Sequence, residues 1–251
     1  ESTISGKSVH IDGTFTHDGA LTCTGIASTN YAFQNLGTWT PGTSQTTTFS
    51  GDGAGTYHVK SNDWNNVILN AADENYYLRP KTGTGITFVG YLTVTDGSLY
   101  QNSNSDSWAV TGAVTINGGR IGLSTGDAEL SFGSLTVASG ATYYATSGTT
   151  KLTGTGTILD INGTFTHNNG KVTITGSGAH STLLPGGATF NNIDLDTTSG
   201  HDTKLQEDII IIGTLDLTGS SDYWIVDAAG AAADVTMTMG SSTASGTIES
   251  N

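Results

Sequence analysis

The chain repeats a long segment of itself, and this constrains its fold more than any other feature. Residues 13–25, GTFTHDGALTCTG, return as residues 163–176, GTFTHNNGKVTITG, with one residue inserted at the turn. Shorter matches follow in the same order: Ser50–Ala54 with Thr175–Ala179, Trp64–Val67 with Phe190–Ile193, and Gly90–Ser98 with Gly213–Ser220. Segments that recur in one order are structural modules, and short strands between Gly and Asn turns indicate a stacked β architecture.

Strand-length runs occur along the whole chain. Most alternate Thr or Ser with Val, Ile, Leu or Phe, and they are bounded by Gly, Asn or Asp. The predicted strands are 8–11, 20–24, 46–49, 57–60, 67–70, 86–89, 91–95, 113–116, 134–137, 157–161, 171–175, 193–196, 209–212, 214–217 and 235–239. A pair of β-sandwiches would show the same alternation, but whole modules that match in order favour a solenoid. We predict an all-β fold, a single elongated parallel β-helix of roughly ten coils of about 20–25 residues, with the sandwich pair as the alternative.

The repeat also predicts the organisation of the chain. No Pro-rich or charge-rich linker interrupts it, so we expect one elongated domain over residues 1–251. Its expected parts are a repeat module at 9–105, simpler coils at 106–158, a second repeat module at 159–225 and a cap or contact segment at 226–251. The alanines of Asp227–Asp234 predict a short helix or a turn of small residues.

Charge and hydropathy exclude several partners. The net charge is −14, with eight Lys and Arg in total, so no basic stripe is present to neutralise phosphates. We therefore expect no nucleic-acid partner. The acidity would oppose docking to an anionic membrane, and no run of eighteen apolar residues is present, so we expect no membrane insertion. The chain begins at Glu1 without an initiator Met, which we interpret as a processed product or a fragment.

The alignment of the two copies predicts which positions face inward. Cys23 aligns with Ile174, which favours a buried thiol over a reactive one. Trp64 aligns with Phe190, which indicates a packing role for both rings. His17 and His167 occupy equivalent positions beside turns, where we expect turn-capping or outward polar roles.

The Asn-Asn pairs before Val67 and Ile193 predict bends in which one residue is left-handed. In stacked coils, aligned amides would also form a ladder like that of cross-β structures, and a purely local turn is the open alternative.

With the repeat laid out, the style of its residues resembles a known type. GTFTHNNGKVTITG at 163–176, FNNIDL at 190–195 and GTLDL at 213–217 are similar to the Gly, Thr and Asn-rich β-helical repeats of phage virion proteins and bacterial surface adhesins. The virion proteins of this kind include tail fibres, spikes and capsid decorations. The resemblance covers most of the chain and implies an extracellular, surface-displayed structural or adhesive role. It carries over no catalytic residues.

Acidic residues are candidates for catalysis and for metal binding, because some parallel β-helices cleave polysaccharides. The densest acidic cluster contains Asp194, Asp196 and Asp202, beside His201 and Lys204. Asp194 and Asp196 share one strand face and are candidate ligands for Ca²⁺, but no EF-hand spacing or calcium-binding nonapeptide occurs. Alternation with Ile and Leu makes them equally natural as solubilising residues. We expect no cofactor and keep Ca²⁺ as the alternative.

Aromatic residues are the other candidate site, because apolar ring faces stack on sugars. The main candidates for carbohydrate contact are Trp39, Trp108, Trp224, Tyr143 and Tyr144, with Tyr76, Tyr77 and Tyr223 as further ones. Packing in the core, in a cap or between subunits is the competing interpretation for these rings.

Two functions therefore remain. The favoured one is a non-enzymatic structural or adhesive protein on a virion or cell surface, acting by self-assembly or attachment. Its expected partners are further copies of the chain, other virion or surface proteins, and cell-surface glycans. The alternative is a β-helix that binds or degrades polysaccharides.

Overall fold

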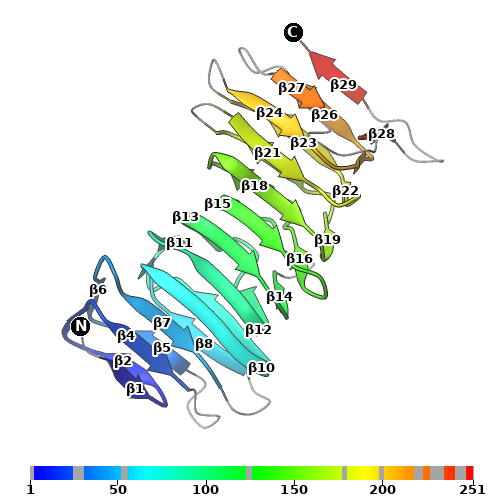
Figure 1. Cartoon of the computed structure of the whole chain (residues 1–251). Coiled ribbons are helices and arrows are strands. Elements are labelled where there is room, and N and C mark those ends of the chain that lie inside the picture. Colours follow the sequence, from blue (N-terminus) through cyan, green and yellow to red (C-terminus); the bar gives the residue numbers. More distant parts are fainter. Residues whose placement is uncertain are drawn as a thin grey trace.

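The chain winds into one elongated, all-β parallel solenoid, in which successive coils stack from the N-terminal to the C-terminal end (Figure 1). The computed structural model describes residues 3–24, 31–51, 56–122, 126–176, 180–197, 201–217, 223–226, 235–240 and 247–250, with the side chains of 223–226 and 247–250 excepted. Every strand pair among these residues is parallel, so the β-helix prediction is confirmed and the sandwich alternative is wrong. Most hydrogen bonds from side chains of one coil to the next join residues 20 to 26 apart, as expected for the predicted coil length.

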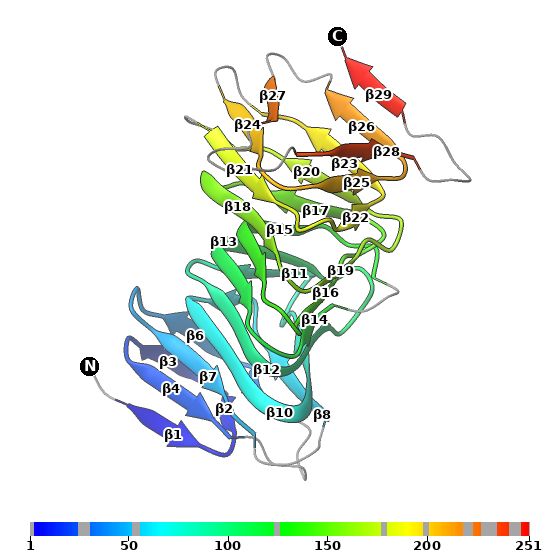
Figure 2. The ribbon, with the colours of Figure 1, turned by 45° about the vertical axis from the view of Figure 1, so that its right-hand side comes forward.

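Each coil has three faces, which the turned view separates (Figure 2). Face 1 consists of β1 (Ile4–Gly6), β4 (Ala20–Cys23), β7 (Thr46–Phe49), the first halves of β10 (Asn66–Arg79) and β12 (Leu92–Gln101), the second halves of β13 (Ser107–Ile116) and β15 (Leu130–Val137), β18 (Gly156–Ile161), β21 (His180–Leu184), β24 (Asp202–Leu205) and β27 (Tyr223–Val226).

Face 2 consists of β2 (Val9–Ile11), β5 (Tyr31–Asn35), β8 (Thr56–Lys60), the second halves of β10 and β12, β14 (Arg120–Ile121), β16 (Thr142–Tyr144), β19 (Thr164–Thr166), β22 (Thr189–Phe190), β25 (Ile209–Ile211) and β28 (Met237–Met239).

Face 3 consists of β3 (Thr14–His17), β6 (Thr38–Pro41), β9 (Asp63–Trp64), β11 (Gly85–Phe88), the first halves of β13 and β15, β17 (Thr149–Leu152), β20 (Lys171–Ile174), β23 (Asn192–Leu195), β26 (Thr214–Leu217) and β29 (Thr247–Ser250).

The segment expected as a C-terminal cap continues the stack in part. β28 pairs with β25 on face 2, and β29 pairs with β26 on face 3, both in parallel. The helix or turn predicted at Asp227–Asp234 lies outside the described residues.

The core runs along the axis of the solenoid, because alternate side chains of every strand point inward. Cys23 and Trp64 are buried there, as the alignment predicts, and their equivalents Ile174 and Phe190 are buried too. Burial raises the pKa of the Cys23 thiol to about 12, which keeps it protonated and unreactive. These inward predictions are confirmed.

The corner between face 3 and face 1 is lined by glycines that follow one another from coil to coil. The Gly112 amide donates to Gly90 O at 2.9 Å, and the Gly154 amide donates to Gly133 O at the same distance. A Cβ at Gly133 would lie 2.4 Å from Thr111 O, so a larger residue would not fit without movement of the backbone. We call Gly90, Gly112, Gly133, Gly154 and Gly176 the glycine column. Close approach of consecutive coils thus requires these glycines.

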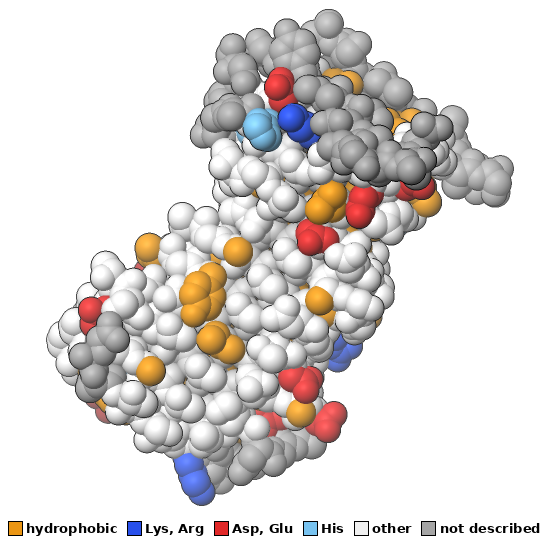
Figure 3. Space-filling view, viewed as in Figure 1, with side chains coloured by type: hydrophobic (Ala, Val, Ile, Leu, Met, Phe, Trp, Pro, Cys, Tyr) orange, Lys and Arg blue, Asp and Glu red, His pale blue; other side chains and the backbone are white. Residues whose placement is uncertain are grey.

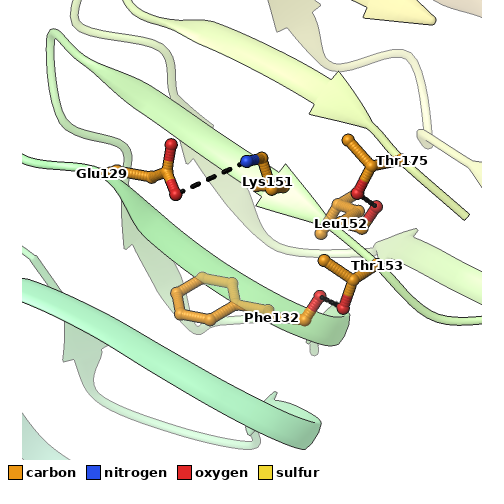
Figure 4. Close-up of polar contacts among 6 residues, drawn as sticks. All are labelled: Glu129, Phe132, Lys151, Leu152, Thr153 and Thr175. Atoms are coloured by element: carbon orange, nitrogen blue, oxygen red, sulfur yellow. Dashed lines mark hydrogen bonds and ion pairs between the residues drawn. The ribbon is translucent and has the colours of Figure 1, made fainter. Parts of the chain in front are cut away.

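Threonines beside the glycine column tie neighbouring coils together. Figure 4 shows the Thr153 hydroxyl donating to Phe132 O at 3.2 Å, and the Thr175 hydroxyl donating to Leu152 O at 3.5 Å. On the adjoining part of face 3, Lys151 forms an ion pair with Glu129 at 3.6 Å in the same view. The Thr-Gly pairs at these corners therefore satisfy carbonyl groups as well as allowing close contact.

The Asn-Asn pairs use their amides rather than a left-handed backbone. Asn65 Nδ2 donates to Thr43 O at 2.6 Å in the preceding coil, and Asn66 Oδ1 accepts from the Tyr91 amide at 3.2 Å in the following coil. The second copy does the same: Asn191 Nδ2 donates to Asn169 O at 2.7 Å, and Asn192 Oδ1 accepts from the Thr214 amide at 2.8 Å.

The bend prediction was therefore wrong in its mechanism. Positive φ values at residues other than glycine occur, among the described residues, at Asp73, Asn168 and Asn169. The cross-coil amide bonds expected of a ladder are present, but they join amides to the backbone rather than to one another. Each Asn-Asn pair thus connects three consecutive coils.

The histidines beside the turns behave as predicted. His17 Nε2 lies 3.2 Å from Ala20 O across its turn, and His167 Nδ1 accepts from the Asn169 amide at 3.0 Å. Both side chains therefore close the turns in which they lie.

Candidate functional site

A row of aromatic side chains lies on the outer side of face 2 in its N-terminal half. Tyr31 pairs with His58, His58 with Tyr77, and Tyr77 with Tyr100, so one ring stands on each of four consecutive coils. The ring centroids are 5.6, 5.7 and 5.1 Å apart in that order, with interplanar angles between 44° and 48°. We call these four residues the aromatic row. Neighbouring rings are tilted against one another; Tyr31, His58 and Tyr77 are half-buried, whereas Tyr100 is 3% exposed.

Basic side chains extend and flank this row. The Arg120 guanidinium lies 5.1 Å from the centre of the Tyr100 ring, a cation–π contact at the end of the row. Its Nε donates to Ser98 Oγ at 3.1 Å. Arg79 donates from Nη1 to the Tyr31 hydroxyl at 2.9 Å, and Lys60 pairs with Arg79 across neighbouring coils. The aromatic row with Lys60, Arg79 and Arg120 is called the basic-aromatic strip below.

The charge of the strip differs from that of the whole protein. Its strand segments, 31–35, 56–60, 75–79, 98–101 and 120–121, contain no Asp or Glu, although the net charge of the chain is −14. Among the described residues, Lys60, Arg79 and Arg120 form no ion pair; the ion pairs found are His10–Asp12, Lys151–Glu129 and Lys171–Asp194. The strip therefore concentrates three of the eight Lys and Arg residues on one face.

The charge of Arg79 affects the pKa values of two titratable groups, His58 in the strip and Asp106 near it. Burial lowers the pKa of His58, and the positive charge of Arg79 lowers it further. The His58 ring is therefore mostly neutral near pH 7, and its Nδ1 is buried without a hydrogen-bond partner. Burial raises the pKa of Asp106, while a hydrogen bond from the Ser103 amide and the charge of Arg79 act in the opposite direction.

A cavity adjoins the N-terminal end of the strip. It has a volume of about 210 Å³ and is lined by Ser8, Val9, His10, Tyr31 and Gln34. His10 is exposed there and pairs with Asp12 at 3.0 Å. His10 pairs with Gln34 of β5, and Gln34 pairs with Lys60, so His10 lies in line with Lys60 rather than with the aromatic row.

The structure removes three of the predicted carbohydrate contacts. Trp39, Trp108 and Tyr143 are 4%, 1% and 0% exposed and lie in the core. Trp39 packs against Phe15 at 5.2 Å, and the Tyr143 hydroxyl is 2.9 Å from Thr150 Oγ1. A buried ring has no face to offer an external sugar, so these three predictions were wrong.

The other predicted aromatics have different outcomes. Tyr76 is also buried, whereas Tyr77 belongs to the aromatic row. Tyr144 is half-buried on face 2, one coil beyond Gly122, which continues the line of the row past Tyr100 without a side chain. The side chains of Trp224 and Tyr223 lie outside the described residues, although the backbone of β27 is described.

The acidic candidates do not converge on one point. Asp194 lies on face 3 and forms an ion pair with Lys171 at 2.7 Å, Asp196 is exposed after that strand, and Asp202 lies on face 1. Among the described residues, no group of three or more His, Cys, Asp or Glu side chains is arranged to hold a metal ion. His201 is buried, with Nε2 2.9 Å from Ser181 Oγ. The corner after β23 separates Asp202 from Asp194 and Asp196, and the role of these aspartates as Ca²⁺ ligands stays a prediction.

The sequence analysis missed Tyr31, His58, Tyr100 and the basic residues as a single site. They are far apart along the chain, and the repeat that aligns residues 13–25 with 163–176 does not include them.

Comparison of the chain with protein-family models, with curated proteins and with solved structures found no match. No helix within the described ranges is long and apolar enough to span a membrane.

Proposed function

We propose that this chain is a non-enzymatic structural and attachment protein of a virion or cell surface. The observation that carries this proposal is the basic-aromatic strip, which follows the long axis of an uninterrupted parallel stack. A stack of this kind is a stiff rod, because each coil is fixed to its neighbours by backbone hydrogen bonds. A binding surface built on such strands keeps its geometry without a moving part.

The remaining surface supports the same role. In Figure 3, apart from the grey residues, most of the visible side of the rod is white, which marks backbone and side chains that are neither charged nor hydrophobic. Face 1 presents a line of outward threonines at Thr93, Thr115 and Thr136, which pair in register on adjacent coils. A regular polar surface of this kind suits an extracellular rod that stands beside other proteins without aggregating.

The outermost strands of the described stack are suited to pairing with further coils, further copies or other surface proteins. Among the described residues, β1 pairs with β4 and β29 pairs with β26, and the other edges of β1 and β29 offer hydrogen-bonding groups to a partner. Homo-oligomerisation or docking on a neighbouring virion or surface protein would cover them.

Electron cryo-microscopy of the native particle or filament tests the structural part of this proposal. We expect copies of the chain in a regular arrangement, with the long axes in defined contacts and face 2 open to the outside. An isolated monomer that shortens polysaccharides, detected by size-exclusion chromatography of the polymer, would contradict the proposal and favour the enzymatic alternative.

A further inference from the structure

We propose that the basic-aromatic strip binds an extended polysaccharide that bears carboxylate groups, with the polymer running along the axis of the solenoid. This inference rests on the proposed attachment function and specifies the ligand of that surface. The strip consists of Tyr31, His58, Tyr77 and Tyr100 with Lys60, Arg79 and Arg120.

The geometry of the strip is linear and periodic. The rings of the row recur every 5.1 to 5.7 Å, one on each coil. Strands in a sheet are spaced by about 4.8 Å, and one sugar of an extended chain spans a distance of the same order. A polysaccharide laid along face 2 would therefore bring one sugar to each coil. A compact ligand would contact only one or two of these positions.

The polar atoms of the strip suit hydroxyl groups. Tyr31, His58 and Tyr77 are half-buried, so the exposed parts of their side chains can contact a ligand, whereas Tyr100 is 3% exposed and its ring supports the Arg120 guanidinium. Tyrosine hydroxyls both donate and accept, as sugar hydroxyls do. His58 is mostly neutral near pH 7 because its pKa is lowered, and Nε2 is the ring nitrogen available to a ligand, since Nδ1 is buried.

The cations select for negative charge. Arg79 uses Nη1 for the Tyr31 hydroxyl, and Arg120 uses Nε for Ser98, which leaves the other guanidinium donors of each side chain for a ligand. Arginine binds carboxylates through paired, charge-assisted hydrogen bonds. The strand segments of the strip contain no Asp or Glu, and Asp106, a carboxyl group that feels the charge of Arg79, is 4% exposed. Lys60 adds a third charge in the coil before Arg79.

The overall acidity of the chain is compatible with this assignment. The net charge of −14 repels polyanions at long range, but exposed charges are screened beyond about 8 Å at physiological ionic strength. Local complementarity at the strip therefore decides binding. The same repulsion opposes a double-stranded nucleic acid, which carries one charge for about every 1.7 Å of its axis, more strongly than a polymer with at most one charge for each sugar.

A packing role is the alternative for the aromatic row, since aromatic pairs across strands stabilise sheets by about 0.2–1 kcal/mol each. That role accounts for the rings, but it does not account for the arginines and the lysine beside them. Removal of positive charge from the strip therefore separates the two interpretations.

The experiment measures binding of the full chain to polygalacturonate, alginate and hyaluronan by isothermal titration calorimetry. The fully methyl-esterified form of polygalacturonate, which differs in charge, is the ligand control. We expect at least one acidic polymer to bind, its affinity to fall as salt rises, and the ester to bind at least about tenfold more weakly. Absence of binding to all three acidic polymers, or equal binding of the ester, would overturn the inference.

The variants test the place of binding. We expect the double substitution Arg79→Gln and Arg120→Gln to weaken binding at least about tenfold. The matched control, Lys151→Gln with Lys204→Gln, removes the same charge from faces 3 and 1 and should leave the affinity within about twofold. Hydrogen exchange of residues 56–122 checks that the strip variant remains folded, and the single variant Lys60→Gln provides a milder test. Equal losses in both double variants would overturn the inference.

Two further arms separate this inference from its alternatives. A single-stranded oligonucleotide of comparable length that binds as tightly as the acidic polysaccharide would overturn it in favour of a general polyanion surface. Shortening of the polysaccharide during the titration would contradict the proposed non-enzymatic function while leaving the ligand class intact. Intact polymer that binds in its charged and esterified forms alike would contradict the ligand class alone.

Discussion

The two copies of the repeat have nearly the same sequence but occupy different faces of the solenoid. In the first copy, Thr14–His17 forms β3 on face 3 and Ala20–Cys23 forms β4 on face 1. In the second, Thr164–Thr166 forms β19 on face 2 and Lys171–Ile174 forms β20 on face 3. The column of strands that begins with β3 therefore reaches β20 rather than β19. The repeated sequence therefore forms a corner between two faces of the solenoid, and it is found at two different corners.

Both copies of this corner have an Asn side chain that lies against a glycine of the next coil. Asn66 Oδ1 receives the Tyr91 amide, and a Cβ at Gly90 would lie 1.9 Å from that oxygen. Asn192 Oδ1 receives the Thr214 amide, and a Cβ at Gly213 would lie 2.3 Å from it. This contact explains why Gly-x-Leu follows Asn-Asn in both copies.

Away from the corners, the two halves differ in what they bury and what they expose. The N-terminal half packs its core with large rings, such as Phe33, Trp39 and Trp64, and carries the basic-aromatic strip outside. The C-terminal half buries mainly aliphatic chains: Leu183, Leu195, Leu205, Ile209, Ile211 and Leu215. The same corner chemistry therefore supports two kinds of surface. A function assigned to one half does not transfer to the other through the repeat.

Removal of the largest ring from the N-terminal core should have the largest effect. Trp64 is 1% exposed, and its ring centroid lies 4.7 Å from that of Phe33 and 5.9 Å from that of Phe49. We expect Trp64→Ala to lower the free energy of unfolding by about 3–5 kcal/mol. In a solenoid, each coil contacts its neighbours, so hydrogen exchange should rise near residue 64 and stay unchanged at residues 202–217.

The control for this variant is Trp64→Phe, which installs the residue of the second copy. The buried Trp64 Nε1 has no hydrogen-bond partner, so the change removes an unsatisfied donor while it loses some contact area. A much smaller loss than for alanine is expected. Equal acceleration of exchange in both halves would show that the halves do not behave as separate regions.

Crowding of the glycine column should have the next largest effect. Gly133→Ala would place a methyl group 2.4 Å from Thr111 O and 2.7 Å from Gly112 O. Because backbone atoms must move, we expect a loss of about 1–3 kcal/mol in urea unfolding. Gly13→Ala is the matched control, since nothing lies within 4 Å of its Cβ position. Similar losses for the two variants would refute the close-approach role of the column.

The two copies of the corner should respond alike to loss of the amide. Asn66→Ala and Asn192→Ala each remove the acceptor of a backbone amide in the next coil. We expect each to cost about 1 kcal/mol by thermal or urea unfolding. Asn162→Ala is the control, because Asn162 is exposed and its Nδ2 bonds Asp160 within the same strand region. A loss of stability in only one of the two variants would mean that the two Asn residues do not stabilise their corners in the same way.

Much of the architecture was readable from the sequence, and the site was not. Strand periodicity and the ordered repeat predict a parallel solenoid, and the alignment of Cys23 with Ile174 predicts inward positions correctly, because the alternation of a strand is local. A further copy of the motif, Gly37-Thr38-Trp39-Thr40, went unrecognised and forms β6, directly stacked on β3. Its register would have placed Trp39 over Phe15 in the core.

The basic-aromatic strip depends on coil lengths that the sequence does not reveal. Tyr31, His58, Tyr77 and Tyr100 are unequally spaced along the chain, and turns of different length bring them into register. One residue more in any of these turns would move a ring to another position or another side of its strand. For the same reason, the sequence does not reveal that the corner after Leu195 places Asp202 on another face than Asp194.

The smallest expected effect concerns pH and is confined to the N-terminal half. The pKa of His58 is lowered in the folded protein from its usual value of 6.5, by burial first and by Arg79 second. The unfolded chain therefore binds a proton more readily than the folded chain as the pH falls. The stability linked to neutral His58 is present above the unfolded pKa and is lost as pH falls through the folded pKa.

We expect the urea midpoint to decrease between about pH 7.5 and about pH 5.5, and the decrease to be smaller in His58→Gln. His180→Gln, at an exposed position on face 1, is the control and should keep the full dependence on pH. Because Arg79 contributes to the lowered pKa, Arg79→Gln should also reduce the dependence, although it leaves the imidazole in place. A decrease that survives in both His58→Gln and Arg79→Gln would place the titrating group outside the strip and remove this distinction between the two halves.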